Sequence, residues 1–203
     1  MYDTPCRRKV YKETKLFMNM IGLIWALIGI IALIIVMIIY YFNRFAVLQN
    51  RIENSLAQID VQLKKRADLV PNLLNSVKGY MKHEKSIITE VTNARKALVS
   101  AGNMQSKIKA GDKLQDALRS IFAIAEGYPN LKANENFLQL QNELSAIEDK
   151  VAYSRQFYND SILDYNMLYT TFPGNMFAGL FRKKQNSYLQ IKESERAVPK
   201  VSF

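Results

Sequence analysis

Hydrophobic and polar positions divide the chain into a uniformly apolar segment and a longer periodic one. Residues 16–43 form 28 consecutive positions without a charge, whereas roughly 20 apolar residues of helix span a bilayer core. A helix buried in a soluble protein is usually shorter and rarely apolar on every face. The sequence therefore predicts a transmembrane helix over 16–43, with membrane residues that include Leu16, Trp25, Tyr40 and Phe42.

A cleaved signal peptide is the closest alternative to this transmembrane helix, and it would also begin with basic residues. Its apolar core, however, has roughly 7–15 residues and is followed by a small-x-small cleavage site. The apolar segment here is far longer and ends in Tyr40, Tyr41 and Phe42, which favour an aromatic belt at the membrane edge. We therefore expect an anchor that is not cleaved.

Beyond Phe42, apolar residues recur at spacings of three and four, which indicates an amphipathic helix. The stripe consists of Phe45, Leu48, Ile52, Leu56, Ile59, Leu63, Val70, Leu73, Val77 and Met81. Arg66 stands where an apolar residue is expected. Because no Gly or Pro separates the stripe from the apolar segment, one helix should continue through both. The spacing also allows coiled-coil packing, and the predicted bundle or oligomer seam is Phe45, Leu48, Ile52, Ile59 and Leu63.

Proline and glycine predict where the helices after residue 44 bend or end. Pro71 lies inside the stripe and should kink or divide the first helix. The helical pattern then persists to residue 101, where Gly102-Asn103 should end it.

Two more helices are expected in the second half of the chain. Gly111 should lie just before the first of them, which Asp112 should cap and Gly127 should end. Asn136 with Gln139 resembles a capping box and should open a helix of about 36 residues, or roughly 54 Å at 1.5 Å per residue, which ends at Phe172.

Long helices with apolar faces and short connections must bury those faces on one another. No segment shows the alternation of a strand. The sequence thus predicts an all-α protein, in which the transmembrane helix continues into an antiparallel bundle of three to four long helices. The expected parts are a basic tail over 1–15, the anchor over 16–43, the bundle over 44–172, and an amphipathic segment with a basic, disordered tail over 173–203.

A short apolar patch beside a basic triplet follows the predicted bundle. The residues expected to touch the membrane surface are Met176, Phe177, Leu180, Phe181, Arg182, Lys183 and Lys184. Such a segment suits the headgroup region. The alternative is a C-terminal hook that packs on the bundle.

Positive charge is concentrated at the two ends of the chain. Residues 1–15 hold five basic and two acidic residues, and residues 182–203 hold six and two, so these tails carry +7 of the net charge of +10. A nucleic-acid-binding protein normally has its basic patch on the folded domain. Basic tails beside an apolar span instead indicate membrane topology and attraction to anionic lipids. We expect membrane lipids, not nucleic acid, as partners.

Residues that carry chemistry are sparse, and no catalytic, cofactor-binding or metal-binding residue is predicted. The one histidine, His83, has only Glu84 beside it, which does not complete a zinc site or a triad. The single cysteine, Cys6, excludes an internal disulfide and a CxxC metal site but leaves acylation open. The glycines form no phosphate-binding loop. We expect a protein without enzymatic activity.

Amides and charges gather beside the apolar stripes in two places, over 51–62 and over 155–166. Such residues either fix helix register and partner choice, as buried polar groups do in coiled coils, or simply form polar surface. The residue pattern leaves both interpretations open.

The chain resembles the LemA family of bacterial membrane proteins. The stretches that carry the resemblance are 50–54 (NRIEN), 58–66 (QIDVQLKKR), 68–73 (DLVPNL), 77–80 (VKGY), 82–84 (KHE), 128–141 (YPNLKANENFLQLQ), 154–160 (SRQFYND), 165–166 (YN), 172–173 (FP) and 178–181 (AGLF). They follow the family's order over nearly all of 44–181. The resemblance implies a single-span protein with a bundle of long helices, without a firmly attached enzymatic activity, and with some relatives linked to magnetosome membranes.

Two functions fit these features. The first is a scaffold, in which anchored bundles form homo-oligomers and order or shape the bacterial membrane. The alternative is a membrane-tethered module that recruits a separate protein of the envelope or of a stress response. We expect the protein in the bacterial inner membrane, with a cytoplasmic N-terminus and an extracytoplasmic bundle, because basic residues are denser before the anchor than after it.

Overall fold

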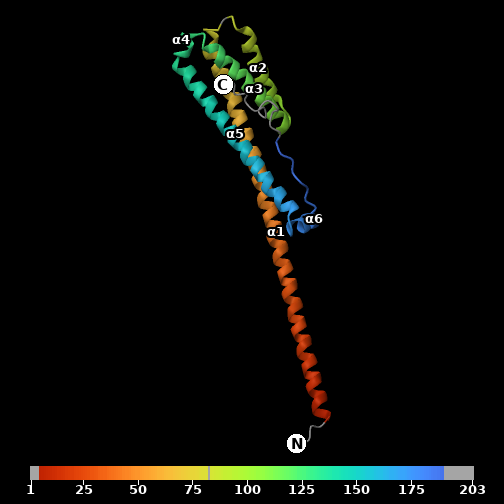
Figure 1. The fold of residues 1–203 in the computed structure, drawn as a ribbon. Coiled ribbons are helices and arrows are strands. Elements are labelled where there is room, and N and C mark those ends of the chain that lie inside the picture. Colours follow the sequence, from red (N-terminus) through yellow and green to blue (C-terminus); the bar gives the residue numbers. More distant parts are fainter. Residues whose placement is uncertain (1–4, 82, 190–203) are drawn as a thin grey trace, which may run out of the picture. The chain divides into compact units, whose positions relative to one another are not determined.

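All secondary structure in the described part of the chain is helical. The structure, a computed structural model, describes residues 5–81 and 83–189, with side chains from Lys15 onward. The helices are α1 (Pro5–Lys78), α2 (Lys85–Ser100), α3 (Met104–Ala125), α4 (Pro129–Lys132), α5 (Glu135–Thr170) and α6 (Gly174–Leu180) (Figure 1). The predicted all-α fold is confirmed. Disorder is expected of the last fifteen residues, 189–203, of which 190–203 lie outside the described residues.

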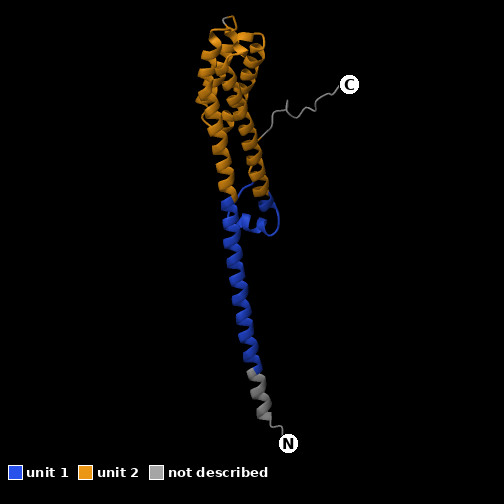
Figure 2. Ribbon diagram, turned by 90° about the vertical axis from the view of Figure 1, so that its left-hand side faces the viewer, with its two compact units in different colours: residues 1–47, 167–185 blue, residues 48–166, 186–203 orange. Residues whose placement is uncertain are grey.

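The chain forms two compact units, and α1 and α5 contribute to both (Figure 2). Unit 1 contains residues 1–47 and 167–185, and unit 2 contains residues 48–166 and 186–203. Each unit is described by itself below.

In unit 1, most of the apolar segment of α1 is exposed. Every side chain from Lys15 to Val36 is exposed, including Trp25 at 69%. Among the described residues, only α1 is long and apolar enough to cross a membrane, with an 18-residue window of mean hydropathy 3.1 that is not buried at all. An apolar surface that the protein itself leaves uncovered is suited to lipid, and a helix satisfies its own backbone hydrogen bonds there.

Unit 2 is a bundle of four helices, α1, α2, α3 and α5, with the short α4 in the connection before α5. Two pairs of residues connect α1 to α3: Asp60 with Lys107 at 2.7 Å, and Arg66 with Gly111 at 3.5 Å. The residue numbers increase from the first pair to the second in both helices. These two helices therefore run in the same direction, as in an up-down-up-down bundle. Side chains in the core that are fully buried include Ile59, Leu63, Leu73, Met81, Leu114, Leu118, Ile121, Leu131, Phe137 and Ile162.

The expected helix from 44 to 101 is wrong, because α1 ends at Lys78 and α2 begins only at Lys85. A turn separates them, in which the backbone N–H groups of Tyr80 and Met81 both donate to the carbonyl of Val77. The turn brings the fully buried Met81 into the core. His83 consequently lies exposed in this turn and not on a helix face.

Two predicted helix starts are also wrong. The cap of α3 is Asn103, whose side chain accepts a hydrogen bond from the N–H of Ser106 at 2.8 Å, and Asp112 lies inside the helix. The cap of α5 is Asn134, which accepts from the N–H of Phe137 at 3.1 Å. In both cases several polar residues compete as caps, and periodicity does not choose among them.

Gly111 is not placed before a helix, as the sequence predicts, but lies buried within α3. A Cβ added there would come within 2.6 Å of Leu63 Cδ2. The absent side chain therefore allows α3 to approach α1 closely, which outweighs the low helix propensity of glycine.

Pro71 lies inside α1 without dividing it. Proline has no N–H, so the carbonyl four residues earlier, that of Ala67, loses its helical donor. Arg95 of α2 supplies a replacement, because its Nε donates to the Ala67 carbonyl at 2.8 Å. The helix continues through the proline because a neighbouring helix satisfies the carbonyl that the proline leaves unpaired.

We predict that Arg95→Met destabilises the bundle by about 1–3 kcal/mol, the usual cost of an unpaired buried polar group. The same substitution in a Pro71→Ala background should cost at least about 1 kcal/mol less, since alanine at this position restores the helical N–H. Thermal unfolding of the four variants in detergent micelles, followed by circular dichroism, measures this coupling. Additive effects, within about 0.5 kcal/mol, would contradict the assignment.

Candidate functional site

In unit 1, an aromatic cluster joins α6 to α1. Its members are Tyr41, Phe42, Phe45, Phe177 and Phe181. Phe177 stacks on Tyr41 with ring centroids 4.7 Å apart, and Phe181 meets Phe42 and Phe45 edge-on at 5.4 and 6.4 Å. These separations are those of favourable aromatic pairs. Two of the predicted membrane-surface residues, Phe177 and Phe181, thus pack on α1.

Two larger apolar residues of α6 point outward, whereas Ala178 is buried. Met176 and Leu180 are 65% and 63% exposed. After them, Arg182 adopts a positive φ of 52°, and the N–H of Lys183 donates to the carbonyl of Ala178. Glycine is the usual residue in this left-handed helix end. α6 therefore has one aromatic face on α1 and one exposed apolar face that leads into Arg182, Lys183 and Lys184.

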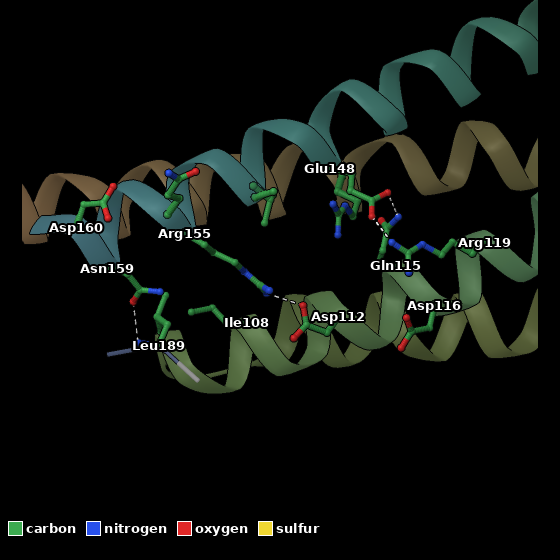
Figure 3. Close-up of a pocket in the computed structure, with 14 residues that line it drawn as sticks. Ile108, Asp112, Gln115, Asp116, Arg119, Glu148, Arg155, Asn159, Asp160 and Leu189 are labelled. Carbon is green, nitrogen blue, oxygen red and sulfur yellow. Dashed lines mark hydrogen bonds and ion pairs between the residues drawn. The ribbon is translucent and has the colours of Figure 1, made fainter. Parts of the chain in front are cut away.

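Unit 2 contains a polar cavity of about 370 Å³, here called the arginine cavity (Figure 3). Its walls come from α1, α3, α5 and the segment 186–189. The lining residues are Arg66, Ile108, Asp112, Gln115, Asp116, Arg119, Glu148, Val151, Ala152, Arg155, Gln156, Asn159, Asp160 and Leu189. Three arginines and four carboxylates line this cavity. Arg119, Asp116 and Asp160 are exposed at its rim, whereas Arg66 is buried, which is unusual for an arginine.

Two of the arginines are paired with carboxylates between the antiparallel helices α3 and α5. Arg155 Nη2 lies 2.5 Å from Asp112 Oδ1, and Arg119 Nη2 lies 2.5 Å from Glu148 Oε1 (Figure 3). Gln115 donates to the other oxygen of Glu148. Charge-assisted bonds of this kind hold the two sides of the cavity together.

Arg66, the third arginine, is 3% exposed and has no carboxylate within ion-pair distance among the described residues. Its one hydrogen bond is from Nη1 to the carbonyl of Gly111 at 3.5 Å, and its Nε is buried without a partner. Burial lowers the pKa of the guanidinium from its ordinary value, while Glu148 and Asp112 act in the opposite direction. Arginine remains charged in proteins, so this is a buried cation with unused donors.

The segment 186–189 is held beside the arginine cavity, which Leu189 lines. The side chain of Asn166 donates to the carbonyl of Asn186 at 2.9 Å and accepts from its N–H at 3.0 Å. Asn159 accepts from the N–H of Leu189 at 3.1 Å (Figure 3). The polar residues noted over 155–166 thus bind backbone from the end of the chain.

The predicted seam residues Phe45, Leu48, Ile52, Ile59 and Leu63 are at most 4% exposed. This chain's own helices therefore cover them. The predicted membrane residues Leu16, Trp25, Tyr40 and Phe42 are all more than half exposed.

The sequence pattern does not predict the arginine cavity. Arg66 is visible as the one charge in the α1 stripe, and this break is the available signal. In the sequence Asp112 resembles a helix cap, and Gln115, Arg119 and Glu148 resemble solvated helix surface. The described residues contain no cluster of three or more His, Cys, Asp or Glu side chains that could hold a metal ion.

An exposed apolar helix together with a four-helix bundle defines a class of membrane-associated helical-bundle proteins. The LemA family matches residues 55–203. The chain belongs to the LemA family.

Sequence relatives of the chain include LemA and magnetosome proteins. The chain is 28% identical to Protein LemA of Metamycoplasma hominis over 155 residues, which cover 73% of this chain and 68% of that protein. It is 23% identical to Magnetosome protein MamQ of Magnetospirillum gryphiswaldense and to Magnetosome protein MamQ 2 of Paramagnetospirillum magneticum, over 82% of this chain and 71% of each relative. These relatives and the apolar helix indicate a membrane-associated protein, and neither name is that of an enzyme.

We predict that Arg66→Met stabilises the bundle by about 1 kcal/mol, because it replaces a buried cation that has no ion pair with an apolar side chain of similar length. The carbonyl of Gly111 should keep its helical partner. Thermal unfolding in detergent measures the change, with Arg95→Met as the control that should destabilise. A loss of about 2 kcal/mol or more in Arg66→Met would show that Arg66 serves packing.

Proposed function

We propose that this protein is a non-enzymatic scaffold of the bacterial inner membrane, anchored by α1, that self-assembles and orders or shapes the bilayer. The observation that carries this proposal is α1 itself. One uninterrupted helix contains both the exposed apolar segment and the stripe that builds the bundle. A helical connection of this kind transmits contacts between bundles to the bilayer better than a flexible linker does.

Because this chain covers the predicted seam, self-assembly must use a different surface. The exposed face of α5 in unit 2 carries four large apolar side chains, Leu138, Tyr153, Phe157 and Leu163. At about 100° per residue they lie within about a third of the helix circumference. Beside Tyr153 is a groove lined by Gln58 and Gln62 of α1.

The occupant we propose for this face is α5 of a second copy. Tyr153 is 68% exposed at the edge of this groove. An exposed tyrosine is typical of interfaces, where its side chain combines apolar area with a hydroxyl donor. Repetition of such contacts between anchored bundles is the proposed origin of the scaffold.

We predict that the full chain in detergent micelles is a homo-oligomer and that Tyr153→Glu with Phe157→Glu reduces its mass to that of the monomer. Both side chains are exposed, so the bundle should stay folded. Light scattering coupled to size exclusion measures the mass. Val99→Glu is the matched control, because Val99 is 63% exposed on α2 and its substitution should leave the oligomer intact. A wild-type chain that is monomeric at high concentration would contradict self-assembly and favour the recruitment of a separate protein.

We further propose that the exposed face of α6 and the basic triplet contact anionic headgroups. Hydrogen exchange in α6 of the full chain should then be slower in anionic nanodiscs than in zwitterionic ones. Met176→Glu with Leu180→Glu should abolish this difference, because carboxylates are repelled by anionic headgroups and leave the interface. Phe172→Glu, which changes a 78% exposed residue outside α6, is the control. Equal protection in the two lipids for the wild type would contradict headgroup contact.

The proposed orientation places the N-terminus in the cytoplasm and the bundle outside it. Protease added to intact spheroplasts should then digest the bundle, and protection of the bundle would reverse the orientation.

A further inference from the structure

Of the three arginines that line the arginine cavity, only Arg66 has no ion pair with a described residue. Asp112 is paired with Arg155, and Glu148 is paired with Arg119. Arg66 is left without an ion pair among the described residues, although it is only 3% exposed. A buried charge without a partner is expensive, and proteins normally avoid it or pair it.

The unused donors of Arg66 define the shape of the missing partner. Nη1 donates to the carbonyl of Gly111, whereas Nε has no partner and Nη2 forms no hydrogen bond with the described residues. Nε and Nη2 form the edge of the guanidinium that a carboxylate meets with two parallel hydrogen bonds. The Nε of Arg155, which lines the same cavity, is also buried without a partner. Within the described residues, the unused buried side-chain groups of the cavity are therefore donors, and the partner must supply acceptors.

We propose that the arginine cavity binds a small organic monocarboxylate, whose carboxylate group pairs with Arg66 and whose apolar body lies against Ile108, Val151 and Leu189. Arg66 is the one arginine of the cavity without an ion pair, and it calls for no more than one negative charge, because the lining as a whole has four carboxylates and three arginines. Asp116 and Asp160 also line the cavity and are exposed, and their charge disfavours a dianion such as phosphate. The volume of about 370 Å³ is in the range of small-molecule sites. This inference is independent of self-assembly.

The test is isothermal titration of sodium hexanoate into the full chain in detergent micelles, corrected with empty micelles. Hexanamide serves as the neutral analogue of the same shape, and inorganic phosphate serves as the dianion. Hexanoate should bind to a single site, at least tenfold more tightly than either analogue. Arg66→Met should weaken hexanoate at least tenfold, and Arg66→Lys should weaken it less, because lysine keeps the charge without the planar donor pair.

Two controls separate loss of the site from loss of the fold. Arg95→Met removes a bundle arginine that does not line the cavity, so hexanoate should bind this variant as it binds the wild type, even though the bundle is less stable. Hexanoate should also raise the unfolding midpoint of the wild type but not that of Arg66→Met. Equal binding to the wild type and Arg66→Met, equal binding of hexanamide, tighter binding of phosphate, or no binding at millimolar hexanoate would each overturn the proposal.

Discussion

Burial of the α1 stripe is the interaction on which the rest of unit 2 depends. Leu48, Ile59, Leu63, Val70 and Val77 are nearly inaccessible to solvent, and α2, α3 and α5 provide the cover. Removing such a side chain from a core costs several kcal/mol. Because the stripe runs along one side of α1 only, the other helices must gather on that side. The opposite side of α1 carries amides and charges.

Two residues of α1, Arg66 and Pro71, depart from this regular apolar packing. Arg66 interrupts the stripe and faces a cavity instead of a packed neighbour, and Pro71 interrupts the hydrogen bonding of the same helix. The two exceptions differ in how they are compensated. Arg95 compensates the proline from within the fold, whereas no described residue neutralises Arg66 through an ion pair. This difference separates a structural irregularity from a candidate ligand site.

Periodicity predicts the fold well, because long apolar stripes have few ways to be buried. The all-α class and the length of α5 follow from spacing, whereas the exposed apolar part of α1 follows from the uncharged segment 16–43. The break after Lys78 is missed because the buried Met81 continues the stripe through a turn. The position of Gly111 inside α3 is also missed. Glycine is needed there because Leu63 of α1, which is distant in the sequence, lies against it. The cavity is missed because its charges come from three helices, and each charge alone resembles solvated surface.

The side of the arginine cavity that Leu189 lines comes from a segment that is synthesised after the bundle helices. Translation proceeds from the N-terminus, so α1, α3 and α5 leave the ribosome before Asn186 and Leu189 do. Asn159 and Asn166 then receive this backbone after the bundle helices have been synthesised. Leu189 is therefore the last of the cavity-lining residues to be synthesised, after the three helices that line the rest of the cavity.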